Sequence, residues 1–125
     1  MATFFMKGNL STIKDSDVYD LLQKIPAGKV STYGDLAKSL GNPDASRAIG
    51  RILGRNPNPI VVPCHRVVKS DGRLGGYVYG IAKKRELLEK EGVSFIGEVV
   101  RDFKHSRIYP QIRRATPVAP ERRKP

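Results

Sequence analysis

Residues 31–53, STYGDLAKSLGNPDASRAIGRIL, decide the fold of this chain. Apolar residues at helical spacing predict one helix over residues 33–40 and a second over residues 45–53. The turn Gly41-Asn42-Pro43 separates them, since Gly ends a helix and Asn and Pro suit a turn that starts the next one. The expected unit is therefore a pair of short helices joined by a tight turn.

The second helix of this pair carries arginines at positions 47, 51 and 55, which the apolar pattern leaves facing outward. Ser31 or Thr32 is expected to cap the first helix. A basic second helix after a tight turn is typical of a helix-turn-helix that enters a DNA groove. A helical hairpin with a solvated basic face has the same pattern, so both interpretations stay open at this point.

Further elements flank this pair. A helix is expected over residues 15–25, with Asp15 or Ser16 as its cap, and another over residues 81–91, ending at Gly92. Between them, residues 60–68 are rich in β-branched side chains and predict a strand or irregular segment, followed by a Gly-rich loop. The fold class is therefore mainly α with a short β or irregular segment.

The chain is strongly basic. Its 125 residues hold 23 Lys and Arg against 12 Asp and Glu, a formal net charge of +11, which makes a polyanion the expected partner. Residues 101–125 alone carry eight basic and two acidic side chains. We therefore expect one compact domain over residues 1–95 and a basic, proline-containing arm over residues 96–125, either contacting phosphates or solvated as a tail.

The single cysteine excludes an internal disulfide and a multi-cysteine zinc cluster. No apolar run is long enough to cross a bilayer and no secretory signal is evident, so a cytoplasmic protein without membrane attachment is expected. Cys64 stands beside His65 and Arg66, whose positive charge favours a reactive thiolate. Side chains at adjacent positions of an extended segment diverge, so a water or a local bend would have to link Cys64 to His65. Glu91 is a candidate to orient the histidine; a buried core thiol is the alternative.

Residues 56–68, NPNPIVVPCHRVV, resemble the active-site signature of the O6-alkylguanine-DNA alkyltransferases, also called methylated-DNA–protein-cysteine methyltransferases. The resemblance covers about residues 10–93 in one unbroken order. It includes PAGKVSTYGDLA (26–37), GNP (41–43), SRAIG (46–50), GRLGGY (72–77) and KRELLEKEG (84–92). Members of the family usually carry a further amino-terminal domain. The resemblance therefore implies the catalytic, DNA-binding domain alone, a winged-helix-like helix-turn-helix domain.

The resemblance implies four roles around the thiol. Cys64 matches the family's nucleophile, His65 its water-linked general base and Glu91 the acid that orients the base. Asn56 matches the hinge asparagine that holds the active-site segment against the helix-turn-helix. These four residues, together with a tyrosine described next, form the expected catalytic set.

The same resemblance implies a DNA interface. Arg47 matches the arginine that fills the gap left by an extruded base. Tyr33 matches the tyrosine that rotates the 3′ phosphate and supplies a proton to the leaving guanine. Asn42 and Ser70 align with further DNA contacts, and the small residues at positions 48 and 50, Ala48 and Gly50, would let the helix approach the backbone closely. In the family this helix lies in the minor groove, which suits repair at any sequence.

The alkylguanine pocket is expected to involve Tyr77, which matches the tyrosine that packs over the flipped base, together with Val67. Two positions depart from the family. Val78 stands where many relatives have serine, and Tyr79 stands where some have glycine at the pocket wall. Tyr79 is expected to narrow the pocket and to favour methyl over benzyl adducts.

The function implied is direct DNA repair. The alkyl group of O6-alkylguanine, or of O4-alkylthymine, would move irreversibly to Cys64 after base flipping, with no metal and no cofactor, in a monomer bound to double-stranded DNA. Four alternatives remain. They are a lesion-binding protein of the alkyltransferase-like kind, which has tryptophan in place of the cysteine, a sequence-specific helix-turn-helix regulator, a cysteine hydrolase and a redox-sensing thiol.

Overall fold

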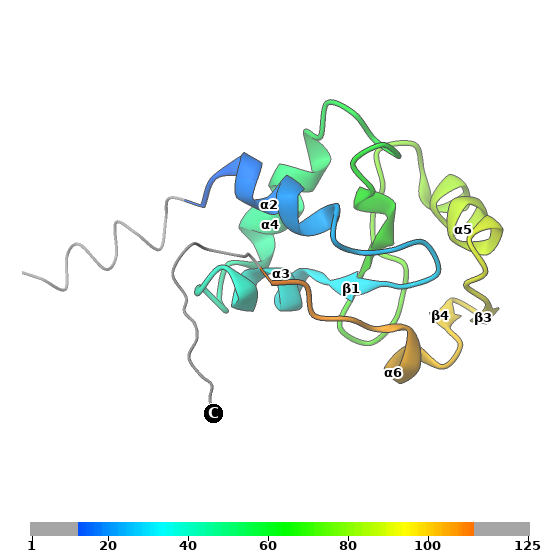
Figure 1. Cartoon of the computed structure of the whole chain (residues 1–125). Helices are drawn as coiled ribbons and strands as arrows, with labels where there is room; N and C mark the ends of the chain where they lie inside the picture. Colours follow the sequence, from blue (N-terminus) through cyan, green and yellow to red (C-terminus); the bar gives the residue numbers. More distant parts are fainter. Residues whose placement is uncertain (1–12, 112–125) are drawn as a thin grey trace, which may run out of the picture.

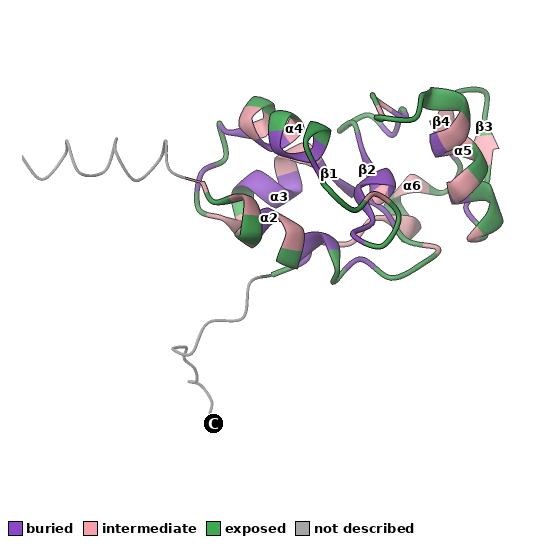
Figure 2. Cartoon of the chain, turned by 90° about the horizontal axis from the view of Figure 1, so that it is seen from above, coloured by how far each residue is buried: buried purple, intermediate pink, exposed green. Residues whose placement is uncertain are grey.

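The structure is a computed structural model that describes residues 13–111. Within this range the chain forms five α-helices, one 3-10 turn and two small two-stranded sheets (Figure 1). Helices predominate and the strands are only two residues long, as the sequence predicts. The helices surround a central purple interior of buried residues, while the outer faces are exposed (Figure 2).

Three helices build the amino-terminal half: α2 (Asp15–Leu22), α3 (Tyr33–Ser39) and α4 (Ser46–Gly54). The α3–α4 pair is the expected helix-turn-helix, with each boundary within one residue of the prediction. Thr32 caps α3, because its hydroxyl accepts a hydrogen bond from the Asp35 amide at 2.9 Å. These helices enclose a core cluster with Leu21, Leu36 and Ile49 among its fully buried members.

The first helix differs from its prediction at both ends. It ends at Leu22 rather than at residue 25. Neither Asp15 nor Ser16 is its cap: Lys14 occupies that position without a side-chain hydrogen bond. The Asp15 carboxylate instead accepts two hydrogen bonds from Arg55, at 2.8 and 2.9 Å, because that guanidinium at the end of α4 offers a charged bidentate partner.

Residues 60–68 are a mixture of turn and strand. They contain the 3-10 turn η1 (Cys64–Arg66) and the strand β2 (Val67–Val68). β2 pairs in parallel with β1 (Ser31–Thr32), in the register Thr32 to Val68. Because β1 leads directly into α3 and η1 leads directly into β2, this pairing fixes the cysteine turn beside the start of the helix-turn-helix.

The carboxy-terminal half has a second, smaller core. It lies under α5 (Ile81–Lys90) and the antiparallel pair β3 (Phe95–Ile96) and β4 (Val99–Val100). Its buried members are Val30, Val68, Leu74, Leu88, Val93 and Val100. Helical spacing places three further apolar residues on the inward faces of their helices, but the structure leaves them only half-buried: Leu40, Ala48 and Leu87.

Residues 96–111, which the sequence assigns to an arm, pack into the domain. After α6 (Phe103–Ser106) the chain runs beside β1 (Figure 1), with the Val30 amide bound to Ser106 and the Ile108 amide bound to Val30. Arg107 donates two hydrogen bonds to the Asp35 carboxylate, at 2.8 and 2.9 Å. Residues 106–108 therefore share hydrogen bonds with Val30 and Asp35 of the amino-terminal half. The rest of the expected arm lies outside the described residues.

Among residues 13–111, no helix combines the length and the apolar character that a membrane span requires.

Replacing Arg107 by methionine is expected to lower the free energy of unfolding by about 3 kcal/mol, because it leaves the buried Asp35 carboxylate without its cation. The Asp35 side chain is only 2% exposed. Urea denaturation followed by circular dichroism measures the change. Arg101→Met, at an exposed position two residues before α6, serves as the control. A loss no larger than the control's would contradict a stabilising role for this pair.

Candidate active site and nucleic-acid interface

Cys64 begins the turn η1 and is 5% exposed. An extended segment would have needed a water or a local bend to link Cys64 to His65, and this turn is such a bend. His65 therefore follows Cys64 within one 3-10 turn rather than along an extended strand. The His65 side chain is completely buried. Its Nε2 faces Glu91, and its Nδ1 hydrogen-bonds to no protein atom of the described residues.

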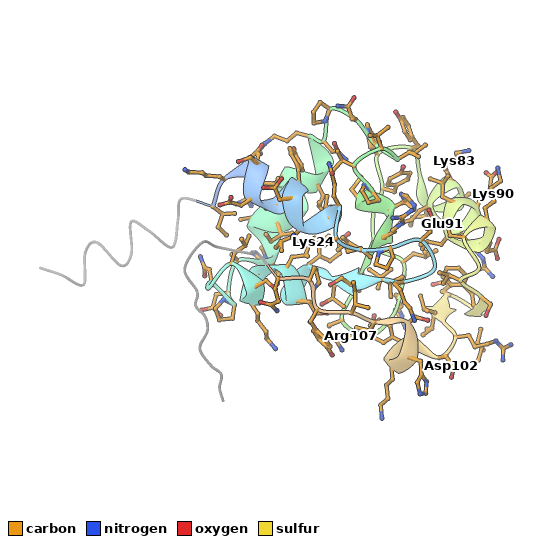
Figure 3. All side chains as sticks on the ribbon, viewed as in Figure 1. Lys24, Lys83, Lys90, Glu91, Asp102 and Arg107 are labelled. Atoms are coloured by element: carbon orange, nitrogen blue, oxygen red, sulfur yellow. The ribbon has the colours of Figure 1, made fainter. Side chains whose placement is uncertain are left out.

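Glu91 connects this turn to the end of α5. Its Oε2 lies 2.9 Å from His65 Nε2 and accepts a hydrogen bond from the Arg66 guanidinium at 2.7 Å, while its Oε1 accepts a second from Arg66 at 2.9 Å. Arg66 also donates to the carbonyl oxygen of Ile25 at 2.6 Å. In Figure 3, Glu91 lies between α5 and the cysteine turn. The expected His65–Glu91 pair is thus in contact, and Arg66 is a partner that the sequence did not assign.

The electrostatics of this cluster keep the histidine neutral and the carboxylate charged. Burial lowers the pKa of His65, although the hydrogen bond and charge of Glu91 act in the opposite direction. Burial alone would raise the pKa of Glu91, but hydrogen bonds from Arg66 and His65 outweigh it and lower that pKa. Because an ionised carboxylate only accepts, Nε2 must donate, and Nδ1 keeps the acceptor lone pair.

The Cys64 thiol is held in its protonated form. Burial raises its pKa, and a hydrogen bond from Asn56 and the charge of Lys84 only partly oppose this. Asn56 is itself buried and tied to the loop that carries the cysteine, since its Nδ2 donates to the Val62 carbonyl and its Oδ1 accepts from the Asn58 amide, both at 2.9 Å. A base is therefore needed to convert this thiol to a thiolate.

Lys84 is fully buried beneath the site, and the sequence did not predict it. Its Nζ donates to the Gly76 carbonyl at 3.1 Å and lies 5.9 Å from the centroid of the Tyr33 ring. Burial lowers its pKa from 10.5 to about 8. The helical spacing could have predicted this burial. On a helix over residues 81–91, positions 84, 88 and 91 lie on one face, and the apolar Leu88 indicates that this face points into the core.

A cavity of about 330 Å³ opens at the thiol, within the range of about 300–1,000 Å³ typical of ligand pockets. Its walls come from α3, α4, the cysteine turn and the Gly-rich loop, and its lining residues are Tyr33, Gly50, Leu53, Gly54, Cys64, Gly76, Tyr77 and Val78. Gly75, with a φ of +74°, lies so close to Tyr33 that a Cβ there would be 3.1 Å from the tyrosine hydroxyl oxygen. The left-handed backbone conformation and the tight approach to Tyr33 both favour glycine at this position.

Two residues expected in the pocket lie elsewhere. Val67 is fully buried in the first core cluster, because the pairing of β2 with β1 turns it inward. Tyr79 is 56% exposed and is not part of the cavity lining. Its ring packs edge-on against Tyr77 with the centroids 5.6 Å apart, so it adjoins the cavity through Tyr77.

The expected DNA-contacting residues are spread around this cavity. Arg47 is exposed on α4, the helix that also supplies Gly50 to the cavity wall, and Ala48 is half-buried on the same helix. Asn42 is buried in the turn before α4, where its carbonyl accepts from the Ala45 amide. Ser70 is exposed just after β2. One exposed arginine-bearing helix therefore borders the cavity that contains the thiol.

No set of three or more His, Cys, Asp or Glu side chains is gathered in a metal-binding arrangement among residues 13–111. The chemistry available in this part of the chain is that of a thiol, a neutral imidazole oriented by a carboxylate, tyrosine hydroxyls and a buried amine.

A family model described as "6-O-methylguanine DNA methyltransferase, DNA binding domain" matches residues 14–93. The chain belongs to this methyltransferase family. The matched range includes every residue of the cavity and of the Cys64, His65 and Glu91 cluster.

Relatives of the methyltransferase family agree with this assignment. The methylated-DNA–protein-cysteine methyltransferase of Methanosarcina acetivorans is 51% identical over 75 residues, 60% of this chain and 48% of that protein. The chain spans about half the length of the curated methyltransferases it matches.

Two solved structures that are similar to this chain are complexes with DNA. Mycobacterium tuberculosis OGT in complex with DNA has a TM-score of 0.61 and 46% identity, covering 65% of this chain and 50% of that one. S. pombe Atl1, in complex with damaged DNA containing O6-carboxymethylguanine, has a TM-score of 0.64 and 30% identity, covering 77% of this chain and 94% of that one.

Replacing Lys84 by methionine is expected to change how stability depends on pH. The pKa of Lys84 is about 8 in the folded chain and 10.5 ordinarily, so between these values the unfolded chain binds a proton that the folded chain has released. This group therefore makes the free energy of unfolding rise as pH increases from about 8 to 10.5. Lys84→Met should remove that rise, as measured by urea denaturation across this range.

Lys83→Met, at a neighbouring lysine that reaches solvent (labelled in Figure 3), is the matched control and should keep the rise. Identical pH dependence in the native protein and Lys84→Met would show that the buried amine titrates normally.

Proposed function

We propose that this domain repairs O6-alkylguanine in DNA by moving the alkyl group irreversibly onto Cys64. The observation that carries the proposal is the position of the thiol: it lines a cavity of ligand size and is followed immediately by a buried histidine bound to Glu91. O4-alkylthymine presents a similar alkyl ether and is a second candidate substrate.

Access to the thiol requires base flipping, since an O6-alkyl carbon lies inside the base stack. The exposed Arg47 would enter the space that the flipped nucleotide leaves, as the family resemblance implies. Ala48 and Gly50 would let α4 approach the minor groove closely, and Asn42 and Ser70 would make further DNA contacts. The support for this is that α4 borders both the cavity and the solvent.

The domain would use α3 and α4 as a winged-helix-like unit, with residues up to 111 as part of it, and would act as a monomer on double-stranded DNA. Its phosphate contacts would be independent of sequence, which suits a repair protein. The hydrogen bonds that Ser106 and Ile108 make with Val30, the residue before β1, support this extent of the domain.

The chemical step is a displacement at carbon. Cys64 Sγ attacks the alkyl carbon, the bond from that carbon to guanine O6 breaks, and its electron pair stays with the guanine. The thiol proton passes to His65 through a water, and Glu91 stabilises the imidazolium that results. The raised pKa of the buried thiol is the reason that such a base is required.

The guanine regains a proton as it leaves. Tyr33 lines the cavity and is the candidate donor, since burial and the charge of Cys64 raise its pKa and keep it protonated at neutral pH. The product is a thioether, which ordinary thiol chemistry does not reverse. Each molecule would therefore react once, with no metal or cofactor taking part.

A second candidate function is lesion binding without transfer. It is favoured by the likeness to S. pombe Atl1, of which the chain covers 94%. The cysteine argues against it, because the alkyltransferase-like proteins resemble this family with tryptophan at that position.

Intact mass spectrometry after incubation with duplex DNA containing O6-methylguanine tests the proposal. We expect a gain of one methyl group per protein molecule, because Cys64 is the only thiol in the chain. Cys64→Ser, which keeps the size of the side chain, should gain none. Tight binding of the damaged duplex without any change in mass would replace repair by lesion binding.

The size of the accepted adduct is expected to depend on Tyr79, which packs against Tyr77 at the cavity. The native protein should react faster with O6-methylguanine than with O6-benzylguanine, since Tyr79 packs edge-on against Tyr77 and would keep that cavity-lining ring from moving aside for a benzyl group. Tyr79→Gly should raise the benzyl rate about tenfold while leaving the methyl rate within about twofold, if roughly 1–3 kcal/mol of steric discrimination is removed. Equal rates for both adducts in the native protein would contradict this.

A further inference from the structure

Two polar atoms beside the cavity have no hydrogen-bond partner among the described residues: His65 Nδ1 and the hydroxyl oxygen of Tyr77. Both are buried away from solvent. Buried polar groups in native proteins are almost always hydrogen-bonded, to protein or to ordered water, because leaving one unpaired is destabilising. Each of these atoms therefore requires a partner other than the protein atoms of residues 13–111.

The two side chains are neighbours. Their ring centroids are 6.4 Å apart and the rings meet edge-on at 69°. Both also adjoin the thiol, since Tyr77 lines the same cavity as Cys64 and His65 is the next residue after Cys64. One water molecule can bridge two polar atoms through hydrogen bonds of about 2.8 Å each, so it is the smallest partner that can serve both.

His65 Nδ1 and the Tyr77 hydroxyl have complementary hydrogen-bonding roles, and a water between them can satisfy both. Glu91 accepts from Nε2–H, so Nδ1 of the neutral His65 needs a donor. The Tyr77 hydroxyl needs an acceptor for its proton. A water that donates to Nδ1 and accepts from Tyr77 satisfies both atoms, and its second proton or lone pair remains for Cys64 Sγ. Three protein partners are the usual number for a buried water.

We propose that Tyr77 is a positioning residue for the proton path: its hydroxyl holds the water that links Cys64 Sγ to Nδ1 of His65. This inference rests on the proposed function and deepens it. When the thiol ionises, its proton passes to the water, and a proton of the water passes to Nδ1, so the water is restored and His65 becomes charged. Tyr77 keeps its own proton throughout.

The environment of Tyr77 favours retention of its hydroxyl proton. Burial, with a further contribution from the charge of Cys64, raises the pKa of Tyr77 to about 12, so it remains a donor at neutral pH. Other titratable groups also act on the thiol: Tyr19 from α2, Tyr33 from α3 and Lys84 from α5. These three groups are the same in the native protein and in a variant that lacks only the Tyr77 hydroxyl.

The test is Tyr77→Phe, which keeps the ring over the cavity and removes only the hydroxyl. The readout is the rate at which iodoacetamide alkylates Cys64 without DNA, measured from pH 6 to pH 10 by intact mass. This reaction needs a thiolate but no flipped base. We expect the rate at neutral pH to fall about threefold to tenfold, the effect of losing one hydrogen bond to the thiolate network. The profile should shift to higher pH and reach the same plateau.

Tyr109→Phe is the matched control, since it makes the same change at an exposed tyrosine outside the site. It should leave the profile unchanged. A Tyr77→Phe profile identical to that of the native protein would overturn the proposal, as would an effect seen only with alkylguanine DNA, which would limit Tyr77 to contacts with the base. Failure of the proposed repair function would look different: the native protein would not accept methyl from DNA, whatever its iodoacetamide profile.

Thermal unfolding of Tyr77→Phe gives an independent check. Removing a hydroxyl that has no partner should raise the melting temperature, because an unpaired buried polar group is costly. The proposal expects a lower melting temperature instead, since the water loses one of its protein partners. A more stable variant would therefore also overturn it.

Discussion

The carboxylate of Glu91 is the point on which the site depends. It joins the end of α5 to the turn η1 through His65 and Arg66, and Arg66 continues the connection to the carbonyl of Ile25 after α2. A partly buried carboxylate with three charge-assisted or imidazole hydrogen bonds is held in one orientation. That orientation decides which histidine nitrogen donates, and hence that Nδ1 is the acceptor available to the thiol.

Burial has two opposite effects on the active-site thiol. Burial protects the thiol of Cys64 but raises its pKa, so the cysteine is not a preformed thiolate. Asn56 and Lys84 oppose this increase in the thiol pKa without cancelling it. The neutral His65 remains able to accept a proton. A nucleophile that ionises only when a base assists it is less exposed to unwanted oxidation or alkylation, because those reactions also require the thiolate.

The two cores place this chemistry next to the helix-turn-helix. The β1–β2 pair connects the cysteine turn to the start of α3, and α4 supplies one wall of the cavity while presenting Arg47 to solvent. The segment after α6 closes against β1, where Arg107 neutralises the buried Asp35 of α3. The backbone pairing of β1 with β2 therefore holds the cysteine turn directly beside the α3–α4 pair.

The sequence by itself determined the helix-turn-helix, the helix after the Gly-rich loop and the identity of the thiol, histidine and carboxylate. The helices follow from local periodicity and turn residues, whereas the three site residues follow from a family resemblance that the chain carries in contiguous stretches. Only the tertiary structure decided that Lys84 lies buried under the cavity, and that residues 101–111 pack as part of the domain. Burial of a cation is set by contacts between segments far apart in the chain. Local polarity predicts the opposite, because a charged residue enters a protein interior only where distant groups compensate it.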